Sequence, residues 1–199
     1  PAFAVFPDSG TWRCFGQCNE GGDIFKFVMK KEGWDFSETL RHLAERAGVV
    51  LEPLTPEKRA EEDQYDRLRE LLESAVKLYQ YHLLETPAGK PALDFLTARG
   101  VKDETIKTFG LGYAPPGYET ALEHFVAHGW GKEDLLDVGL ANKRDDGGFY
   151  DKFRNRVMFP IRDANGRMTG FGARILDPND VPKFLNSPQT ALFDKSHLL

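Results

Sequence analysis

The 199 residues are 41% hydrophobic and include 15 Phe, a composition that supports a packed core and excludes a disordered chain. The formal net charge of −5 argues against a protein that coats nucleic acid through uniform positive charge. No run approaches the roughly 18 apolar residues of a membrane-spanning helix, so we expect no membrane partner.

Residues 1–51 predict a hairpin followed by two helices. Phe3 and Val5 alternate with small residues, which is typical of a strand, and residues 11–14 would form the return strand. We expect an Asp at the N-cap of each helix. The helices are predicted over residues 24–33, after Asp23, and from Asp35, with Glu38 at capping-box spacing, through Arg46 to a stop at Gly48.

Cys14 and Cys18 lie in a Gly-rich knuckle after the hairpin. Two cysteines this close indicate a reducing compartment and a metal or redox role rather than a disulfide framework. A structural zinc site requires four ligands, and a knuckle of this kind supplies two of them. The pair therefore predicts half of a zinc site, and two unrelated buried thiols are the alternative.

Residues 52–64 predict a linker, because two prolines and a cluster of charges interrupt the apolar periodicity, although Thr55-Pro56 could also begin the next helix. A core-facing stripe predicts that helix: Tyr65, Leu68, Leu72, Ala75, Tyr79 and Leu83. Shorter helices are expected over residues 92–100, 103–110, 118–129 and 132–138, with a turn at 145–148.

His124 and His128 lie one helical turn apart, which is a ligand spacing in zinc enzymes. The residues between them are Phe-Val-Ala and lack the catalytic Glu of that motif. We therefore interpret the pair as the polar edge of an amphipathic helix, with a metal site as the alternative.

The segment 153–187 predicts a β-hairpin. Asn165-Gly166 is a strong signal for a type I′ turn, which needs positive φ at both central residues. Strict alternation would place one set of side chains on a core face: Phe153, Val157, Phe159, Ile161, Thr169, Phe171, Ala173 and Ile175. The opposite face would be flat and basic, with Arg154, Arg156, Met158, Arg162, Gly170, Gly172 and Arg174.

Positive charge is concentrated at this end of the chain. Residues 151–199 hold eight Lys or Arg against five Asp, whereas the remainder has 18 basic and 26 acidic residues. Glycine inside a strand often marks the close approach of a ligand, and arginine matches the geometry of phosphate oxygens. The hairpin therefore predicts a groove for a phosphodiester backbone, with Lys183, Asn186 and Ser187 nearby. A solvated strand face is the alternative.

KFRNRVMFPIRDANGRMTGFGARIL, followed by PKFLNSP, resembles the polymerase core of bacterial replicative DNA primases of the DnaG type. TIKTFGLGYAP and RDDGGFYDKF extend the resemblance upstream, and CFG followed by GGD resembles the second half of that family's zinc-binding domain. The family usually spaces its cysteines Cys-x2-Cys, whereas the spacing here is Cys-x3-Cys. The chain starts at Pro1 without Met and stops within a segment that we expect to be ordered, so we interpret it as truncated at both ends.

The resemblance implies an α+β fold: a zinc-ribbon-like hairpin with helices, then a mixed α/β core subdomain with an antiparallel hairpin. The implied domains are a zinc-binding domain lacking its N-terminal part, a linker, and the N-terminal subdomain of the polymerase core, over residues 1–51, 52–64 and 65–199. The implied nucleic-acid or nucleotide contacts are Arg154, Asn155, Arg156, Arg174, Lys183, Asn186 and Lys195, and the implied zinc ligands are Cys14 and Cys18.

The implied activity is synthesis of short RNA primers on a single-stranded DNA template from nucleoside triphosphates, in the bacterial cytoplasm at the replisome. Mg²⁺ or Mn²⁺ would be held by carboxylates of a following TOPRIM subdomain, so the fragment alone is expected to be inactive. A replicative helicase would bind a missing C-terminal domain. The alternatives are a non-catalytic single-strand-binding module, with Phe3, Trp12 and Phe15 for base stacking, and part of a phage primase-helicase.

Overall fold

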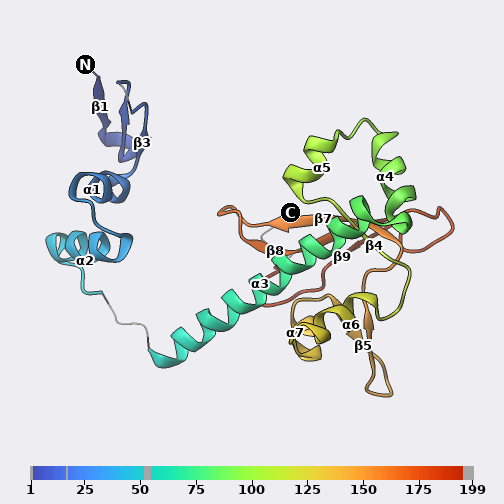
Figure 1. The fold of residues 1–199 in the computed structure, drawn as a ribbon. Coiled ribbons are helices and arrows are strands. Elements are labelled where there is room, and N and C mark those ends of the chain that lie inside the picture. Colours follow the sequence, from blue (N-terminus) through green and yellow to red (C-terminus); the bar gives the residue numbers. More distant parts are fainter. Residues whose placement is uncertain (1, 17, 52–54, 195–199) are drawn as a thin grey trace. The chain divides into compact units, whose positions relative to one another are not determined.

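The computed structural model describes residues 2–16, 18–51 and 55–194, and the chain forms two compact units, Pro1–Thr55 and Pro56–Leu199 (Figure 1). Helices and antiparallel sheets occur in both, as the α+β prediction requires. Within the described ranges, no helix is long and apolar enough to cross a membrane.

The first unit is a three-stranded antiparallel sheet followed by two helices. The strands β1 (Phe3–Phe6), β2 (Thr11–Cys14) and β3 (Gly21–Gly22) lie in that order, with the 3-10 turn η1 (Pro7–Ser9) between the first two. The helices are α1 (Ile24–Glu32) and α2 (Phe36–Ala47). Asp23 accepts a hydrogen bond from the N–H of Lys26, and Asp35 accepts one from the N–H of Glu38, so both predicted N-caps are confirmed.

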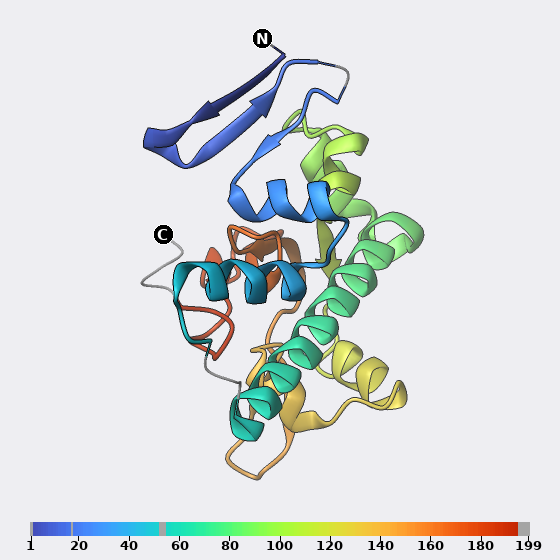
Figure 2. The same cartoon turned by 90° about the vertical axis from the view of Figure 1, so that its left-hand side faces the viewer.

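The second unit is built on a long helix, α3 (Pro56–Glu85), that lies beside a four-stranded sheet in both views (Figures 1 and 2). Residues 56–64, which we assigned to the linker, form the first turns of this helix because Pro56 is well suited to a first helical position. The predicted core-facing stripe is confirmed from Leu68 on, since Leu68, Leu72, Ala75, Tyr79 and Leu83 are all buried. Its first member, Tyr65, is only half-buried, and its hydroxyl donates to the Glu61 carboxylate of the same helix.

The sheet order is β4-β7-β8-β9, and every neighbouring pair is antiparallel. Its strands are β4 (Gly112–Ala114), β7 (Arg156–Arg162), β8 (Met168–Ile175) and β9 (Phe184–Asn186). Gly112 allows α3 to approach β4 closely, because a Cβ at this position would lie 2.5 Å from the Cβ of Tyr79. The Tyr79 ring also packs edge-on against Phe171, with 5.6 Å between centroids.

Smaller elements flank this frame. They are η2 (Pro87–Gly89), α4 (Lys90–Thr97), α5 (Asp103–Phe109), α6 (Thr120–Ala127), α7 (Lys132–Asp137), β5 (Ala141–Lys143) and β6 (Phe149–Asp151). The four shorter predicted helices are therefore confirmed. One core cluster joins α3, α6 and α7 to one face of the sheet, and a second joins α4 and α5 to Tyr113 and Val157 on the other.

The turn of the central hairpin differs from the type I′ prediction. Gly166 has φ +79°, but Asn165 is not among the residues with positive φ. The N–H of Gly166 donates to the carbonyl of Asp163, and the N–H of Asp163 donates to the carbonyl of Arg167, so the loop is longer than two residues. The Asp163 carboxylate accepts the N–H groups of Asn165 and Arg167 and stabilises this loop.

A one-residue bulge follows the turn. Arg162 pairs with Met168, but Ile161 pairs with Gly170, which leaves Thr169 unpaired. The Thr169 hydroxyl donates to the Ile161 carbonyl at 3.0 Å, a contact that occupies the gap in the ladder. Because a shift of one residue exchanges the faces of a strand, every β8 side chain beyond the bulge lies on the face opposite to the predicted one relative to β7.

The predicted division into a core face and a basic face was therefore wrong. Directly opposed residues share a face, so Phe159 lies beside Gly172, and Val157 lies beside Arg174. Arg156 correspondingly lies on the face of Ile175, which is the face that packs against α3. Both faces are thus partly buried, and the basic residues are separated rather than lined up on one surface.

Candidate nucleic-acid interface

Most of the predicted contact residues meet at one end of the four-stranded sheet. The antiparallel pairing places the beginning of β7, the end of β8 and the beginning of β9 together, with Arg156 opposite Ile175 and Arg174 opposite Phe184. Arg154 and Asn155 precede β7, and Lys183 precedes β9. Residues about thirty positions apart in the sequence therefore gather at one end of the sheet, on both of its faces, and we call this region the sheet end.

Cations and aromatic rings alternate on the face of the sheet end that carries Arg174. The Arg174 guanidinium carbon lies 5.4 Å from the centre of the Phe95 ring and 5.2 Å from that of Phe184. Lys183 Nζ lies 5.7 Å from the Phe184 ring, and the Arg99 guanidinium carbon lies 3.6 Å from the Phe95 ring. We call these five residues the cation–aromatic row. Each contact is within the range of a cation–π interaction.

The row carries positive charge that its surroundings do not neutralise. Across residues 2–16, 18–51 and 55–194, neither Arg99, Arg174 nor Lys183 forms an ion pair with a carboxylate. Phe184 lies on the edge strand β9 and is 59% exposed, so one face of its ring is open to solvent. The row therefore presents both cations and an aromatic face to solvent. Phe95 and Arg99 were not predicted from the sequence, because α4 reaches the sheet only in the folded chain.

Arg154 is held in place by two aromatic rings. Its guanidinium carbon lies 4.6 Å from the centre of the Tyr118 ring and 5.4 Å from that of Tyr150, and its Nη1 donates to the carbonyl of Asp151. Asn155 takes φ +49°, a left-handed conformation that Asn tolerates better than most residues. Its side-chain oxygen accepts a hydrogen bond from the Tyr113 hydroxyl at 3.0 Å.

Arg156 is already engaged with its own chain. Its side chain is only 5% exposed, its Nη1 donates to the Pro182 carbonyl at 2.7 Å, and its Nη2 lies 3.4 Å from the Asp180 carboxylate. Both contacts lie in the segment that leads into Lys183. The geometry therefore favours a role for Arg156 in positioning this segment over direct contact with a phosphate.

The glycines of β8 face neighbours within the protein. A Cβ at Gly170 would lie 2.8 Å from the Phe193 ring and from the Ser187 hydroxyl, and one at Gly172 would lie 3.3 Å from the Asn186 side-chain oxygen. Ser187 is buried and accepts the N–H of Phe171 at 3.0 Å, so it supports the sheet. Asn186 is exposed beside the row. The remaining predicted contact, Lys195, lies outside the described residues.

A buried carboxylate that the sequence did not reveal lies behind Arg154. Asp151 is 2% exposed and accepts the backbone N–H groups of Ala121 and Leu122, both at 2.8 Å, at the start of α6. Burial raises the pKa of Asp151 to about 6, against the opposing effect of the two hydrogen bonds. The donors lie about thirty residues upstream, so no local spacing could have identified this contact.

The two cysteines of the first unit lie within reach of each other. Neither forms a disulfide, and a hydrogen bond with the Cys14 thiol is the main reason that the pKa of Cys18 is lowered, followed by the backbone at Glu20. Two adjacent thiols fit the soft-donor chemistry of zinc. In the part of the chain that the structure describes, no group of three or more His, Cys, Asp or Glu side chains could hold a metal, so the pair supplies half of a tetrahedral set.

Comparisons with known proteins agree with this architecture. Residues 1–59 match the family model of the CHC2 zinc finger, and residues 79–199 match that of the DNA primase catalytic core, N-terminal domain. The chain is 43% identical over 200 residues to a DNA primase of Deinococcus radiodurans and 41% identical over 201 residues to one of Salmonella typhimurium. It aligns over its whole length but spans only 33% and 34% of these relatives, respectively.

Two solved structures are similar in fold. One is a DnaG primase catalytic domain bound to ssDNA, with 41% identity, a TM-score of 0.63, and coverage of 69% of this chain and 44% of that chain. The other contains the zinc-binding and RNA polymerase domains of the Aquifex aeolicus primase, with 29% identity, a TM-score of 0.60, and coverage of 98% and 46%. Because the catalytic-core model matches more than half of the chain and follows a matched zinc finger, the chain belongs to the DnaG-type DNA primase family.

Proposed function

We propose that this chain is the part of a DNA primase that binds single-stranded template and primer beside the polymerase centre. The observation that carries the proposal is the cation–aromatic row, whose cations lack carboxylate partners among the described residues and whose Phe184 ring is exposed. The similar catalytic domain bound to ssDNA supports the proposal. The whole enzyme would synthesise short RNA primers from nucleoside triphosphates.

The row suits a flexible strand better than a rigid duplex. Single-stranded nucleic acid exposes its bases, and an aromatic face such as Phe184 can stack on any of them. Arg99, Arg174 and Lys183 would neutralise backbone phosphates. Arg154, which lies over the rings of two tyrosines, would add a further positive charge. Arg156 would hold the segment 176–183 in place, with Asn186 donating hydrogen bonds at the margin.

Primer synthesis also needs metal chemistry. Phosphoryl transfer requires divalent ions, Mg²⁺ or Mn²⁺, held by clustered carboxylates that neutralise the charge of the transition state. The described residues contain no such cluster, so we assign this task to a TOPRIM subdomain of the whole enzyme. Cys14 and Cys18 would supply two of four zinc ligands in the first unit. A replicative helicase partner and a cytoplasmic location at the replisome follow from the proposed role.

The binding proposal is tested by fluorescence anisotropy of a labelled single strand over a range of salt concentrations. Replacing both Arg174 and Lys183 with Ala should weaken binding to every sequence and lower the salt slope by roughly 0.7 for each phosphate that is no longer neutralised. Phe184→Ala should weaken binding by about 1–3 kcal/mol for one stacked base and leave the salt slope unchanged. Lys132→Ala, which removes an exposed cation at the start of α7, is the matched control.

An unchanged salt slope in the folded double variant would identify the row as an ordinary solvated surface. A primer-synthesis assay with Mg²⁺ or Mn²⁺ then distinguishes part of an enzyme from a non-catalytic binding module. This chain should bind single strands without making primer, and the same chain extended at its C-terminus should make primer. Binding without synthesis by both proteins would favour a non-catalytic module.

A further inference from the structure

An exposed tyrosine lies against the guanidinium group of Arg154. Tyr118 is 60% exposed, and the Arg154 guanidinium carbon lies 4.6 Å from the centre of its ring. The same carbon lies 5.4 Å from the centre of the Tyr150 ring, which is 6.5 Å from the ring of Tyr118. A guanidinium that lies over an aromatic ring uses its flat face for this contact, so its N–H groups stay available for hydrogen bonds.

The backbone at Tyr118 is fixed by the segment that carries Arg154. The N–H of Asn155 donates to the carbonyl of Pro115 at 3.3 Å, and the N–H of Asp151 donates to the carbonyl of Tyr118 at 2.6 Å. The two segments therefore run side by side, with hydrogen bonds on both sides of Arg154. Because these bonds use backbone groups, a change of the Tyr118 side chain should leave them in place.

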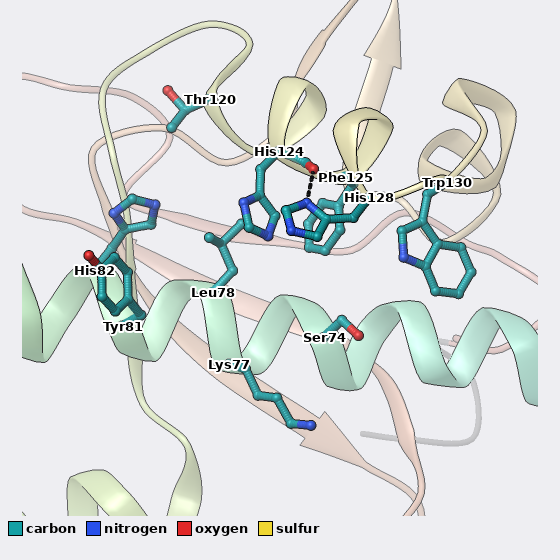
Figure 3. Close-up of a pocket in the computed structure, with 10 residues that line it drawn as sticks. All are labelled: Ser74, Lys77, Leu78, Tyr81, His82, Thr120, His124, Phe125, His128 and Trp130. Carbon is teal, nitrogen blue, oxygen red and sulfur yellow. Dashed lines mark hydrogen bonds between the residues drawn. The ribbon is translucent and has the colours of Figure 1, made fainter.

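Asp151 contacts both partners of the ring contact. Its carbonyl accepts a hydrogen bond from Arg154 Nη1, and its carboxylate accepts two backbone N–H groups at the start of α6, just after Tyr118. Between Tyr118 and its neighbours the chain also turns tightly. A Cβ at Gly117 would lie 2.1 Å from the hydroxyl oxygen of Thr120, which is the first residue of α6 (Figure 3). The ring of Tyr118 is thus attached to a well-fixed backbone.

Most of the hydrogen-bonding capacity of Arg154 is unused. Within residues 2–16, 18–51 and 55–194, its bond to Asp151 is its only hydrogen bond, and it forms no ion pair with a carboxylate. Arg144 differs in this respect. Its guanidinium carbon also lies 5.4 Å from the Tyr150 ring, but its Nη2 lies 3.5 Å from the Glu119 carboxylate. Arg154 is therefore the cation of this group that is free to bind an anion.

We infer that Tyr118 is a positioning residue for Arg154, whose ring holds the guanidinium ready to bind a phosphate of the single strand. Binding through a mobile arginine costs conformational entropy, and a ring that orients the side chain beforehand removes part of this cost. Tyr150 adds a second contact of the same kind at a longer distance. The inference rests on the proposed function, in which Arg154 adds positive charge for the strand.

The test is a double-mutant cycle on the whole chain, measured by fluorescence anisotropy of a labelled oligothymidylate. Arg154→Ala should raise the Kd roughly tenfold and lower the salt slope by roughly 0.7, because one phosphate contact is lost. Tyr118→Leu should raise the Kd by roughly two- to fivefold, the effect of one exposed cation–π contact. Tyr118→Phe keeps the ring and should restore most of the affinity. In the Arg154→Ala background, Tyr118→Leu should have no further effect.

The matched control is Tyr81→Leu, which should leave the Kd unchanged. Tyr81 is 55% exposed, close to the value for Tyr118, but it lines a pocket between α3 and α6, where its ring lies 5.7 Å from that of His82 (Figure 3). Circular dichroism checks that each variant is folded.

Three results would overturn the inference. The first is an unchanged Kd in folded Tyr118→Leu. The second is an equal loss on Tyr118→Leu in the Arg154→Ala background, or a loss that Tyr118→Phe shares, since either would show that the tyrosine contacts the strand directly. The third is an unchanged Kd and salt slope in Arg154→Ala. The proposed function is judged separately from these results, by the variants of Arg174 and Lys183.

Discussion

The buried carboxylate of Asp151 should make the stability of the second unit depend on pH in an unusual direction. Asp151 accepts two backbone N–H groups at the start of α6, and these hydrogen bonds favour the anion. Burial opposes them and is the larger effect, so the pKa rises from 3.8 to about 6. The informative change is Asp151→Asn, which keeps the shape and one acceptor oxygen but cannot ionise.

The size of the effect follows from this shift. The folded pKa is higher than the unfolded one, so the folded state holds its proton more tightly. The contribution to stability is therefore complete below about pH 4 and is lost as the pH rises through 6. A difference of roughly 2 pKa units corresponds to about 3 kcal/mol. The free energy of unfolding of the wild type, relative to Asp151→Asn, should thus fall by about 2–3 kcal/mol between pH 4 and pH 8.

Urea unfolding of both proteins at several pH values measures this difference. Subtracting the free energy of unfolding of the variant from that of the wild type cancels the contributions of the other titrating groups. One of these is Asp163, whose pKa is lowered by hydrogen bonds from Arg167 and Asn165 in the hairpin loop. Asp145→Asn removes an exposed turn carboxylate and is the matched control.

The sign of the difference decides between two accounts of the site. If the difference instead grows with pH, the hydrogen bonds from Ala121 and Leu122 outweigh burial, and Asp151 acts as a charged N-cap of α6. A carboxyl chemical-shift titration of Asp151 gives the same answer directly. A midpoint near or below 3.8 would refute the reasoning, whatever the unfolding data show.

Two further predictions concern Arg156 and the cysteines. Arg156→Lys should destabilise the second unit by about 1–3 kcal/mol, because lysine cannot contact both Pro182 and Asp180, and should leave the salt slope of single-strand binding unchanged. A slope that falls by roughly 0.7 would instead reveal that Arg156 binds a phosphate. Because Cys14 and Cys18 supply only two ligands, the chain should bind zinc weakly or by sharing it between molecules, as measured by chelator competition. Stoichiometric, chelator-resistant zinc in the monomer would contradict this.

The features that the sequence predicted correctly are local ones. Asp23 and Asp35 cap helices through hydrogen bonds to residues three positions ahead, so the spacing is visible in the chain itself. The stripe along α3 is equally local, because the period of a helix places Leu68, Leu72 and Ala75 on one side. In both cases the pattern that makes the prediction lies within a single helix and its cap.

The features that the sequence did not predict depend on contacts between elements. Phe95 and Arg99 lie on and just beyond α4, and nothing in their spacing shows that they meet Arg174 of β8. Asp151 likewise reaches α6 from the end of β6. The basic composition of residues 151–199 indicated the right region, but some of the rings that orient the cations, such as Phe95 at Arg174 and Tyr118 at Arg154, come from elsewhere in the chain.

The bulge at Thr169 explains why the basic composition located the right region although the predicted faces of the hairpin were wrong. Without the unpaired residue, β8 would pair with β7 in the register of Arg162 and Met168 along its whole length. Arg174 would then lie on the face that packs against α3, away from Phe95 and Phe184, and Phe171 would no longer pack against Tyr79. The inserted residue instead directs Phe171 into the core and Arg174 towards Phe95 and Phe184. Bulges often reorient side chains beside functional sites. Here one extra residue allows β8 to contribute side chains both to the core and to the candidate interface.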